Sequence, residues 1–252
     1  MESSIFPIPM IICEYRAYLP SAGLFTAFSA FVAYTILRLK RDKFKLIFFT
    51  AIFLIIPTLG ITAYMRNSLW KDEIILWTDT SKKSPLNARP HFNLGVAYTA
   101  REDYLSAIKH FKKTLKILPD DKEAKEYLGS AYVNLGNQYS DEGHPYAAEE
   151  MYKLAILHLE PIFNGQNEFL DAAYTNLGNK YSDSGDLDKA EEMFQTAIGR
   201  NPALPAVYYN LGVIYERKSD ISNAIAQYEK ALSLDPEYAY PRERLSVIRP
   251  PR

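Results

Sequence analysis

Apolar residues are distributed very unevenly along the chain. Two long runs without a charged residue occupy the N-terminal quarter, 21 residues at 17–37 and 20 residues at 46–65. Beyond residue 66, apolar positions recur at helical spacing among many Asp, Glu, Lys, Asn and Tyr residues. The first pattern suits a hydrocarbon environment and the second suits helices in contact with water. The sequence therefore predicts two structurally different parts.

Each apolar run is close to the roughly 20 residues that a helix needs to cross a bilayer. We therefore predict transmembrane helices at 18–38 and 46–65, with a kink at Pro57 in the second. A fully buried helix of a globular domain is the alternative interpretation of each run. Two such runs that are separated only by a short charged loop favour the membrane.

The distribution of basic residues predicts an orientation. The loop at 39–45 is rich in Lys and Arg, whereas Arg16 is the only basic residue of the segment that precedes the first run. Basic loops remain on the cytoplasmic side, so residues 1–17 and all residues after 65 are predicted to be extracytoplasmic. The corresponding location is the inner membrane of a bacterium, with the C-terminal part in the periplasm.

A sequence repeat runs through the C-terminal part. The tripeptide Asn-Leu-Gly occurs four times, and each occurrence is followed by a Tyr three residues after the Gly, an Ala twelve residues after it and an aromatic residue sixteen residues after it. The glycines are Gly95, Gly136, Gly178 and Gly212. Their spacings of 41, 42 and 34 residues imply insertions of seven and eight residues relative to a 34-residue period.

This pattern resembles the tetratricopeptide repeat (TPR) family. The resemblance implies an all-α fold, a right-handed α-solenoid in which each repeat is a pair of helices. We predict four repeats within 87–238, a half-repeat capping helix at 66–86, and a C-terminal capping helix and tail at 239–252. The repeats are predicted at 88–121, 129–162, 171–204 and 205–238. The insertion near 122–128 predicts a longer first helix in the second repeat, and the insertion near 162–169 predicts a surface loop.

Composition excludes several classes of function. The net charge of −1 and the absence of a basic stripe argue against nucleic-acid binding. The single cysteine, Cys13, cannot form a disulfide within the chain. Asp186 and Asp188 form a short acidic motif, but they fall in the ordinary turn of a repeat, and the four histidines have no metal-ligand spacing. We predict no catalytic residue, no metal and no cofactor.

The repeated asparagine is the candidate binding residue. In related arrays this position faces the concave surface, where side-chain amides could hold the backbone of an extended peptide or of a protein partner. A purely structural role for these amides is the alternative. The predicted peptide-binding residues are Asn93, Asn134, Asn137, Asn176, Asn179 and Asn210.

The segment Glu14-Tyr-Arg-Ala-Tyr-Leu-Pro-Ser21 resembles a motif of the transmembrane TPR O-mannosyltransferases, enzymes that use polyprenyl-phosphate sugars. The resemblance implies that Arg16, oriented by Glu14, binds the phosphate of a membrane lipid such as polyprenyl-phosphate. The catalytic acid of that family lies in a membrane region that this sequence does not contain. Two functions remain open: a membrane-anchored TPR scaffold, or the catalytically incomplete C-terminal part of a protein O-glycosyltransferase.

Overall fold

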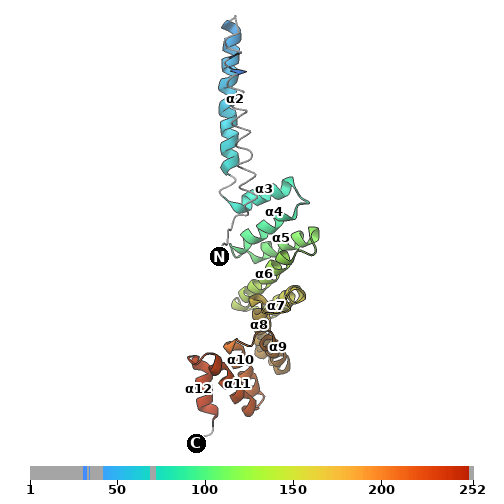
Figure 1. Cartoon of the computed structure of the whole chain (residues 1–252), viewed down its shortest axis with the longest axis vertical. Coiled ribbons are helices and arrows are strands. Elements are labelled where there is room, and N and C mark those ends of the chain that lie inside the picture. Colours follow the sequence, from blue (N-terminus) through green and yellow to red (C-terminus); the bar gives the residue numbers. More distant parts are fainter. Residues whose placement is uncertain (1–30, 33, 35–41, 69–71, 250–252) are drawn as a thin grey trace. The chain divides into compact units, whose positions relative to one another are not determined.

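The computed structural model describes residues 31, 32, 34, 42–68 and 72–249. The chain divides into two compact units, residues 1–68 and residues 69–252. In the first unit the main described element is the helix α2 (Asp42–Ser68), and in the second the helices α3 to α12 follow one another in chain order (Figure 1). Each unit is described separately below.

The prediction of two transmembrane helices is wrong, because no helix of the described residues is long and apolar enough to cross a membrane. The second apolar run belongs to α2, which also includes charged residues at both ends and contains Pro57. Most of the predicted helix at 18–38 lies outside the described residues. The extracytoplasmic location stays a prediction.

The all-α solenoid is confirmed by the second unit. A capping helix, α3 (Glu73–Lys83), precedes four helix pairs, and α12 (Ala239–Ile248) follows them. The pairs are α4 (Ala88–Thr99) with α5 (Tyr104–Ile117), α6 (Lys122–Asp141) with α7 (Pro145–Leu159), α8 (Glu168–Ser184) with α9 (Leu187–Arg200), and α10 (Pro205–Arg217) with α11 (Ile221–Leu234). Each helix packs on the next, so the core runs continuously through the array.

The repeated glycine packs against the repeated aromatic ring. A Cβ atom built on Gly95, Gly136, Gly178 or Gly212 would lie only 2.4–2.7 Å from the ring of Phe111, Tyr152, Phe194 or Tyr228, respectively. These four rings are nearly inaccessible to solvent. A missing side chain on the first helix thus leaves the space that the ring of the second helix fills, and the fixed separation of sixteen residues follows from this contact.

The turn within each helix pair contains one residue in the left-handed backbone region. Gly143 and Gly185 supply it in the second and third repeats, with φ of 78° and 85°. Glu102 and Ser219 occupy the same place in the first and fourth repeats, with φ of 59° and 63°. A residue with a Cβ atom is strained in this conformation by about 1–2 kcal/mol. The turn geometry is therefore imposed by the packing of the helices rather than by glycine alone.

The two insertions are accommodated differently. The seven-residue insertion lengthens α6 to 20 residues, compared with 12 in α4 and 13 in α10, as predicted. The eight-residue insertion is only partly a loop. It forms a 3₁₀ turn, η2 (Glu160–Ile162), a short loop at 163–167, and additional residues of α8, which is 17 residues long.

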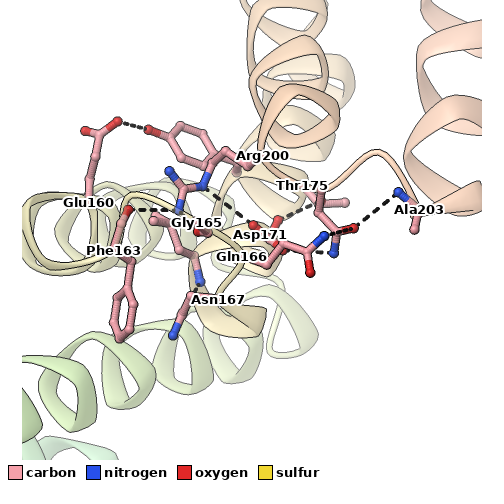
Figure 2. A network of polar contacts seen from close by, with 12 residues as sticks. Glu160, Phe163, Gly165, Gln166, Asn167, Asp171, Thr175, Arg200 and Ala203 are labelled. Carbon is pink, nitrogen blue, oxygen red and sulfur yellow. Dashed lines mark hydrogen bonds and ion pairs between the residues drawn. The ribbon is translucent and has the colours of Figure 1, made fainter.

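Arg200 connects the insertion loop to the third repeat (Figure 2). Its guanidinium group donates hydrogen bonds to the carbonyl oxygens of Phe163 and Gly165 at 3.2 and 2.7 Å. Its Nε lies 3.6 Å from Oδ1 of Asp171, a side chain on α8 that is almost completely buried. The other carboxylate oxygen of Asp171 accepts a hydrogen bond from Asn201 at 3.1 Å. The loop is therefore an ordered connection between the second and third repeats.

Candidate functional site

The six predicted asparagines lie on the first helix of each pair. Asn93 is on α4, Asn134 and Asn137 on α6, Asn176 and Asn179 on α8, and Asn210 on α10. The Leu and Gly that follow the repeated Asn are buried in the core, whereas each of the six asparagines keeps contact with solvent. Four of these residues also contact one another across repeats. We call the six residues the amide row.

Two hydrogen bonds connect asparagines of successive repeats. Nδ2 of Asn176 donates to Oδ1 of Asn137 at 2.8 Å, and Nδ2 of Asn210 donates to Oδ1 of Asn179 at 3.0 Å. These bonds join α6 to α8 and α8 to α10. Asn93 and Asn134 make no side-chain hydrogen bond to any residue that the structure describes. The other four members of the amide row are thus hydrogen-bonded in pairs, whereas the two at its N-terminal end have no side-chain hydrogen bond within the described part of the chain.

The hydrogen-bonding capacity that remains differs along the amide row. Oδ1 of Asn137 also accepts a hydrogen bond from the hydroxyl of Tyr152 at 2.9 Å, so both of its lone pairs are used. Asn137 therefore offers only its N–H groups to a ligand. Asn210 retains a free carbonyl oxygen and one N–H, and Asn176 retains a free carbonyl oxygen. Unused donors and unused acceptors are therefore both present along the amide row, and a peptide backbone offers partners for both.

Tyr152 stays protonated at physiological pH and can act as this donor. Burial, together with the negative charge of Asp141, raises the pKa of the Tyr152 hydroxyl to about 12, although a hydrogen bond with Asn176 opposes the effect. The ring of the same residue fills the space beside Gly136. Tyr152 thus connects the packing of the second repeat directly to the position of Asn137.

A groove lies at the N-terminal end of the amide row. Its volume is about 420 Å³, and Asn134 and Asn137 form part of its wall. The sequence reasoning missed the other lining residues, which are Glu102, Tyr104, Gln138, Asp141 and Glu142. Gln138, Asp141 and Glu142 follow Asn134 by four, seven and eight residues, so their proximity to Asn134 could have been predicted from the sequence. Glu102 and Tyr104, in contrast, come from the preceding repeat. Only the folded array brings the two groups together.

Basic side chains occupy the third and fourth repeats of the same surface. Lys180, four residues after Asn176, contacts Oγ of Ser140 at 3.0 Å and a carboxylate oxygen of Asp183 at 3.1 Å. Arg217, seven residues after Asn210, donates to the carbonyl and hydroxyl oxygens of Ser182 at 2.7 and 2.8 Å. Both cations are thus engaged by groups of the array itself.

The acidic motif at Asp186 and Asp188 has structural partners. Asp186 accepts a hydrogen bond from the backbone N–H of Lys189 at 3.4 Å and so caps α9. Asp188 pairs with Nζ of Lys218 at 2.5 Å, and the same ammonium group contacts Glu191 at 2.7 Å. Within the described part of the chain, no group of three or more His, Cys, Asp or Glu side chains is arranged to hold a metal ion.

Two histidines that are far apart in sequence lie close together. The Nδ1 atoms of His91 on α4 and His110 on α5 are 3.4 Å apart, and the ring of Tyr98 stacks on His110. Burial, together with the positive charges of Lys113, His91 and Lys109, lowers the pKa of His110 to about 4. Burial is also the main cause of the lowered pKa of His91. Both rings are therefore neutral at physiological pH.

The predicted lipid-phosphate site of Glu14 and Arg16 lies outside the described residues. Neither residue can be placed relative to the array, and the structure gives no support for a lipid partner.

Comparison with protein families identifies the repeats. Three models of the tetratricopeptide repeat family match the chain, at residues 88–121, 127–203 and 175–239. Together these matches include the whole amide row and all four helix pairs except the first five residues of α6.

Among curated proteins, the chain is 26% identical over 162 residues to the human protein O-mannosyl-transferase TMTC3. This alignment covers 64% of the chain but only 16% of the human protein, so the chain spans about a sixth of the length of that relative. The Drosophila melanogaster Tmtc3 is 24% identical over 150 residues, which are 58% of the chain and 15% of the relative. Human tetratricopeptide repeat protein 17 is 30% identical over 81 residues, 32% of the chain and 7% of that protein.

Two solved structures are similar to the array. The crystal structure of MamA is 28% identical and covers 66% of this chain and 88% of its own, with a TM-score of 0.47. The crystal structure of YrrB, described as a TPR protein with an unusual peptide-binding site, is 18% identical and covers 75% and 89%, with a TM-score of 0.48. On the strength of the repeats, their packing and the family matches, the chain belongs to the tetratricopeptide repeat proteins and resembles the protein O-mannosyl-transferase TMTC3.

Proposed function

We propose that the array is a scaffold that binds an extended polypeptide along its concave surface, with the amide row in contact with the peptide backbone. The observation that carries this proposal is the pair of hydrogen bonds between Asn137 and Asn176, and between Asn179 and Asn210, which hold the amides of successive repeats side by side and leave some of their donors and acceptors unused. An extended peptide presents its own N–H and C=O groups in alternation. Backbone recognition of this kind does not require a particular sequence.

The unengaged end of the row gives the cleanest test. Among the described residues, Asn93 and Asn134 have no side-chain hydrogen bond. Their replacement by Ala therefore removes hydrogen-bonding groups that a ligand could use without breaking a hydrogen bond within the array. Each lost hydrogen bond weakens binding by about 1 kcal/mol, and two together lower the affinity roughly tenfold or more. Binding is measured by the fluorescence anisotropy of a set of short, labelled, unstructured peptides.

Asn164→Ala is the matched control, because Asn164 is an exposed asparagine of the insertion loop and lies outside the amide row. This variant should bind as the natural chain does. Unchanged affinity of the Asn93→Ala/Asn134→Ala variant, with a natural helix content by circular dichroism, would show that the amide row is not a binding surface.

The similarity to human protein O-mannosyl-transferase TMTC3 favours a second, more specific candidate function. In this proposal the array presents acceptor polypeptides for protein O-glycosylation, and the chemistry is performed by residues that are not part of this chain. Transfer of a sugar to oxygen requires a Ser or Thr hydroxyl on the acceptor. Peptides bound by the array should therefore be enriched in Ser and Thr, and equal binding of a peptide set that lacks both residues would contradict this candidate.

A further inference from the structure

The groove between the first and second repeats has an unbalanced charge. Glu102, Asp141 and Glu142 contribute three carboxylates to its wall, and the lining includes no Lys or Arg. Among the described residues, the Glu102 and Asp141 side chains have no hydrogen bond or ion pair. Glu142 accepts one hydrogen bond, at 2.8 Å, from the neutral amide of Gln138. The negative charge in the groove is therefore not neutralised by the protein.

This imbalance is not a general property of the array. Some carboxylates that face a neighbouring repeat are paired with cations, as Glu191 is with Lys218 at 2.7 Å and Glu216 is with Arg244. The negative charge of Asp141 also acts within the second repeat, where it contributes to the raised pKa of Tyr152. A cation in the groove would offset a repulsion that the folded chain leaves in place.

A second, independent feature of the groove indicates a ligand with a carbonyl group. The oxygen of Asn137 is saturated by Tyr152 and Asn176, so the N–H groups of this residue can only donate, and no acceptor for them is present in the described part of the chain. A lysine or arginine of an extended peptide supplies both missing partners. Its backbone carbonyl accepts from Asn137, and its side chain carries the cation.

The dimensions and the remaining lining agree with this occupant. A groove of about 420 Å³ is large enough for one arginine or lysine side chain and part of the backbone. Tyr104 adds an aromatic ring to the wall, and guanidinium groups pack well on such rings. Carboxylates hold a guanidinium group through charge-assisted hydrogen bonds.

We propose that this groove is a specificity site for a lysine or arginine side chain of the bound peptide, so that the array selects basic segments. The inference rests on the proposed function, because the amide row holds the peptide backbone that brings the side chain into the groove. It adds a preference that the sequence-independent amide row does not have.

The test compares two labelled peptides on the full-length chain. One contains a central arginine in an unstructured sequence of Gly, Ala and Ser, and in the other that arginine is replaced by citrulline, which has nearly the same shape but no charge. We expect the arginine peptide to bind about five- to tenfold more tightly at low salt, and the difference to shrink as salt is added. Fluorescence anisotropy measures both affinities.

The variant Glu102→Gln/Asp141→Asn/Glu142→Gln should remove this preference and leave the affinity for the citrulline peptide unchanged. The control variant Asp120→Asn/Glu123→Gln/Glu237→Gln removes the same charge from exposed positions outside the groove and should keep the preference. Equal binding of the two peptides, or an equal loss of preference in both variants, would overturn the inference.

The outcome also separates this inference from the proposed function. If the groove inference alone is wrong, the two peptides bind equally and the Asn93→Ala/Asn134→Ala variant weakens both. If that asparagine variant weakens neither peptide, or if neither peptide binds the natural chain, the proposed function is wrong and the groove inference is contradicted with it.

Discussion

Gly178 has no space for a side chain, and its replacement by alanine is expected to destabilise the array. A Cβ atom there would lie 2.7 Å from Cε1 of Phe194 and 2.9 Å from Cδ1. Phe194 is 1% exposed, so its ring cannot move away into solvent. Overpacking of this kind costs about 1–3 kcal/mol, whereas the better helix propensity of alanine returns about 1 kcal/mol. We therefore expect the free energy of unfolding to fall, by up to about 2 kcal/mol.

Gly199→Ala is the matched control, since Gly199 also lies within a helix but nothing is within 4 Å of the position of its Cβ atom. Here only the propensity effect remains, and the stability should rise by about 0.5–1 kcal/mol. Urea unfolding followed by far-UV circular dichroism measures both values, and an unchanged dependence on urea concentration shows that each variant unfolds from the same folded state.

A third variant tests the cause of the effect. Phe194→Leu creates space beside Gly178, so Gly178→Ala should cost less in the Phe194→Leu background than in the natural chain. The packing argument is refuted if Gly178→Ala and Gly199→Ala shift the stability in the same direction, or if the cost of Gly178→Ala is independent of residue 194.

Three further perturbations follow from the structure. Arg200→Met leaves the buried carboxylate of Asp171 without its cation and should lower the unfolding free energy by about 3 kcal/mol; addition of Asp171→Asn should recover part of this loss, as measured by urea unfolding. The pKa of His110 is lowered from 6.5 to about 4, so the neutral ring favours the folded state above pH 6.5 and this stability is lost as the pH falls from 6.5 towards 4. Thermal melts across that range should show the loss, and His110→Gln should reduce it. Ser219→Gly relieves a left-handed backbone with φ of 63° and should raise the stability by about 0.5 kcal/mol in urea, whereas Ser219→Val should lower it.

The repeats were predictable because both partners of the central contact are visible in the sequence. Gly178 and Phe194 are separated by the same sixteen residues as Gly95 and Phe111, so a local pattern reports a tertiary contact. The longer α6 was predictable for a similar reason, since seven residues are close to two turns and keep the buried face of the helix in register. Both features depend on contacts within one repeat.

Contacts between repeats were not predictable in the same way. Asn176 and Asn137 are 39 residues apart and Asn210 and Asn179 are 31 apart, three residues less than the glycine spacings, because the repeated Asn bonds to the Asn three residues further on in the preceding repeat. The proximity of Glu102 to Asp141 likewise depends on how the first repeat packs on the lengthened α6. The transmembrane prediction used the length and composition of the apolar runs alone, and those criteria do not determine the helix that forms.

The hydrogen bonds within the amide row have a consequence for the kinetics and entropy of recognition. Asn137, Asn176, Asn179 and Asn210 are already held in single rotamers by one another and by Tyr152. Ordering such a side chain costs about 0.5–1.5 kcal/mol of free energy. In the amide row this cost is already met when the chain folds, so it does not oppose ligand binding. A preorganised surface of this kind also makes its members interdependent, because removal of Asn137 would free the side chain of Asn176. The loss of affinity caused by each single substitution in the amide row should consequently exceed an equal share of the loss caused by replacing all members together.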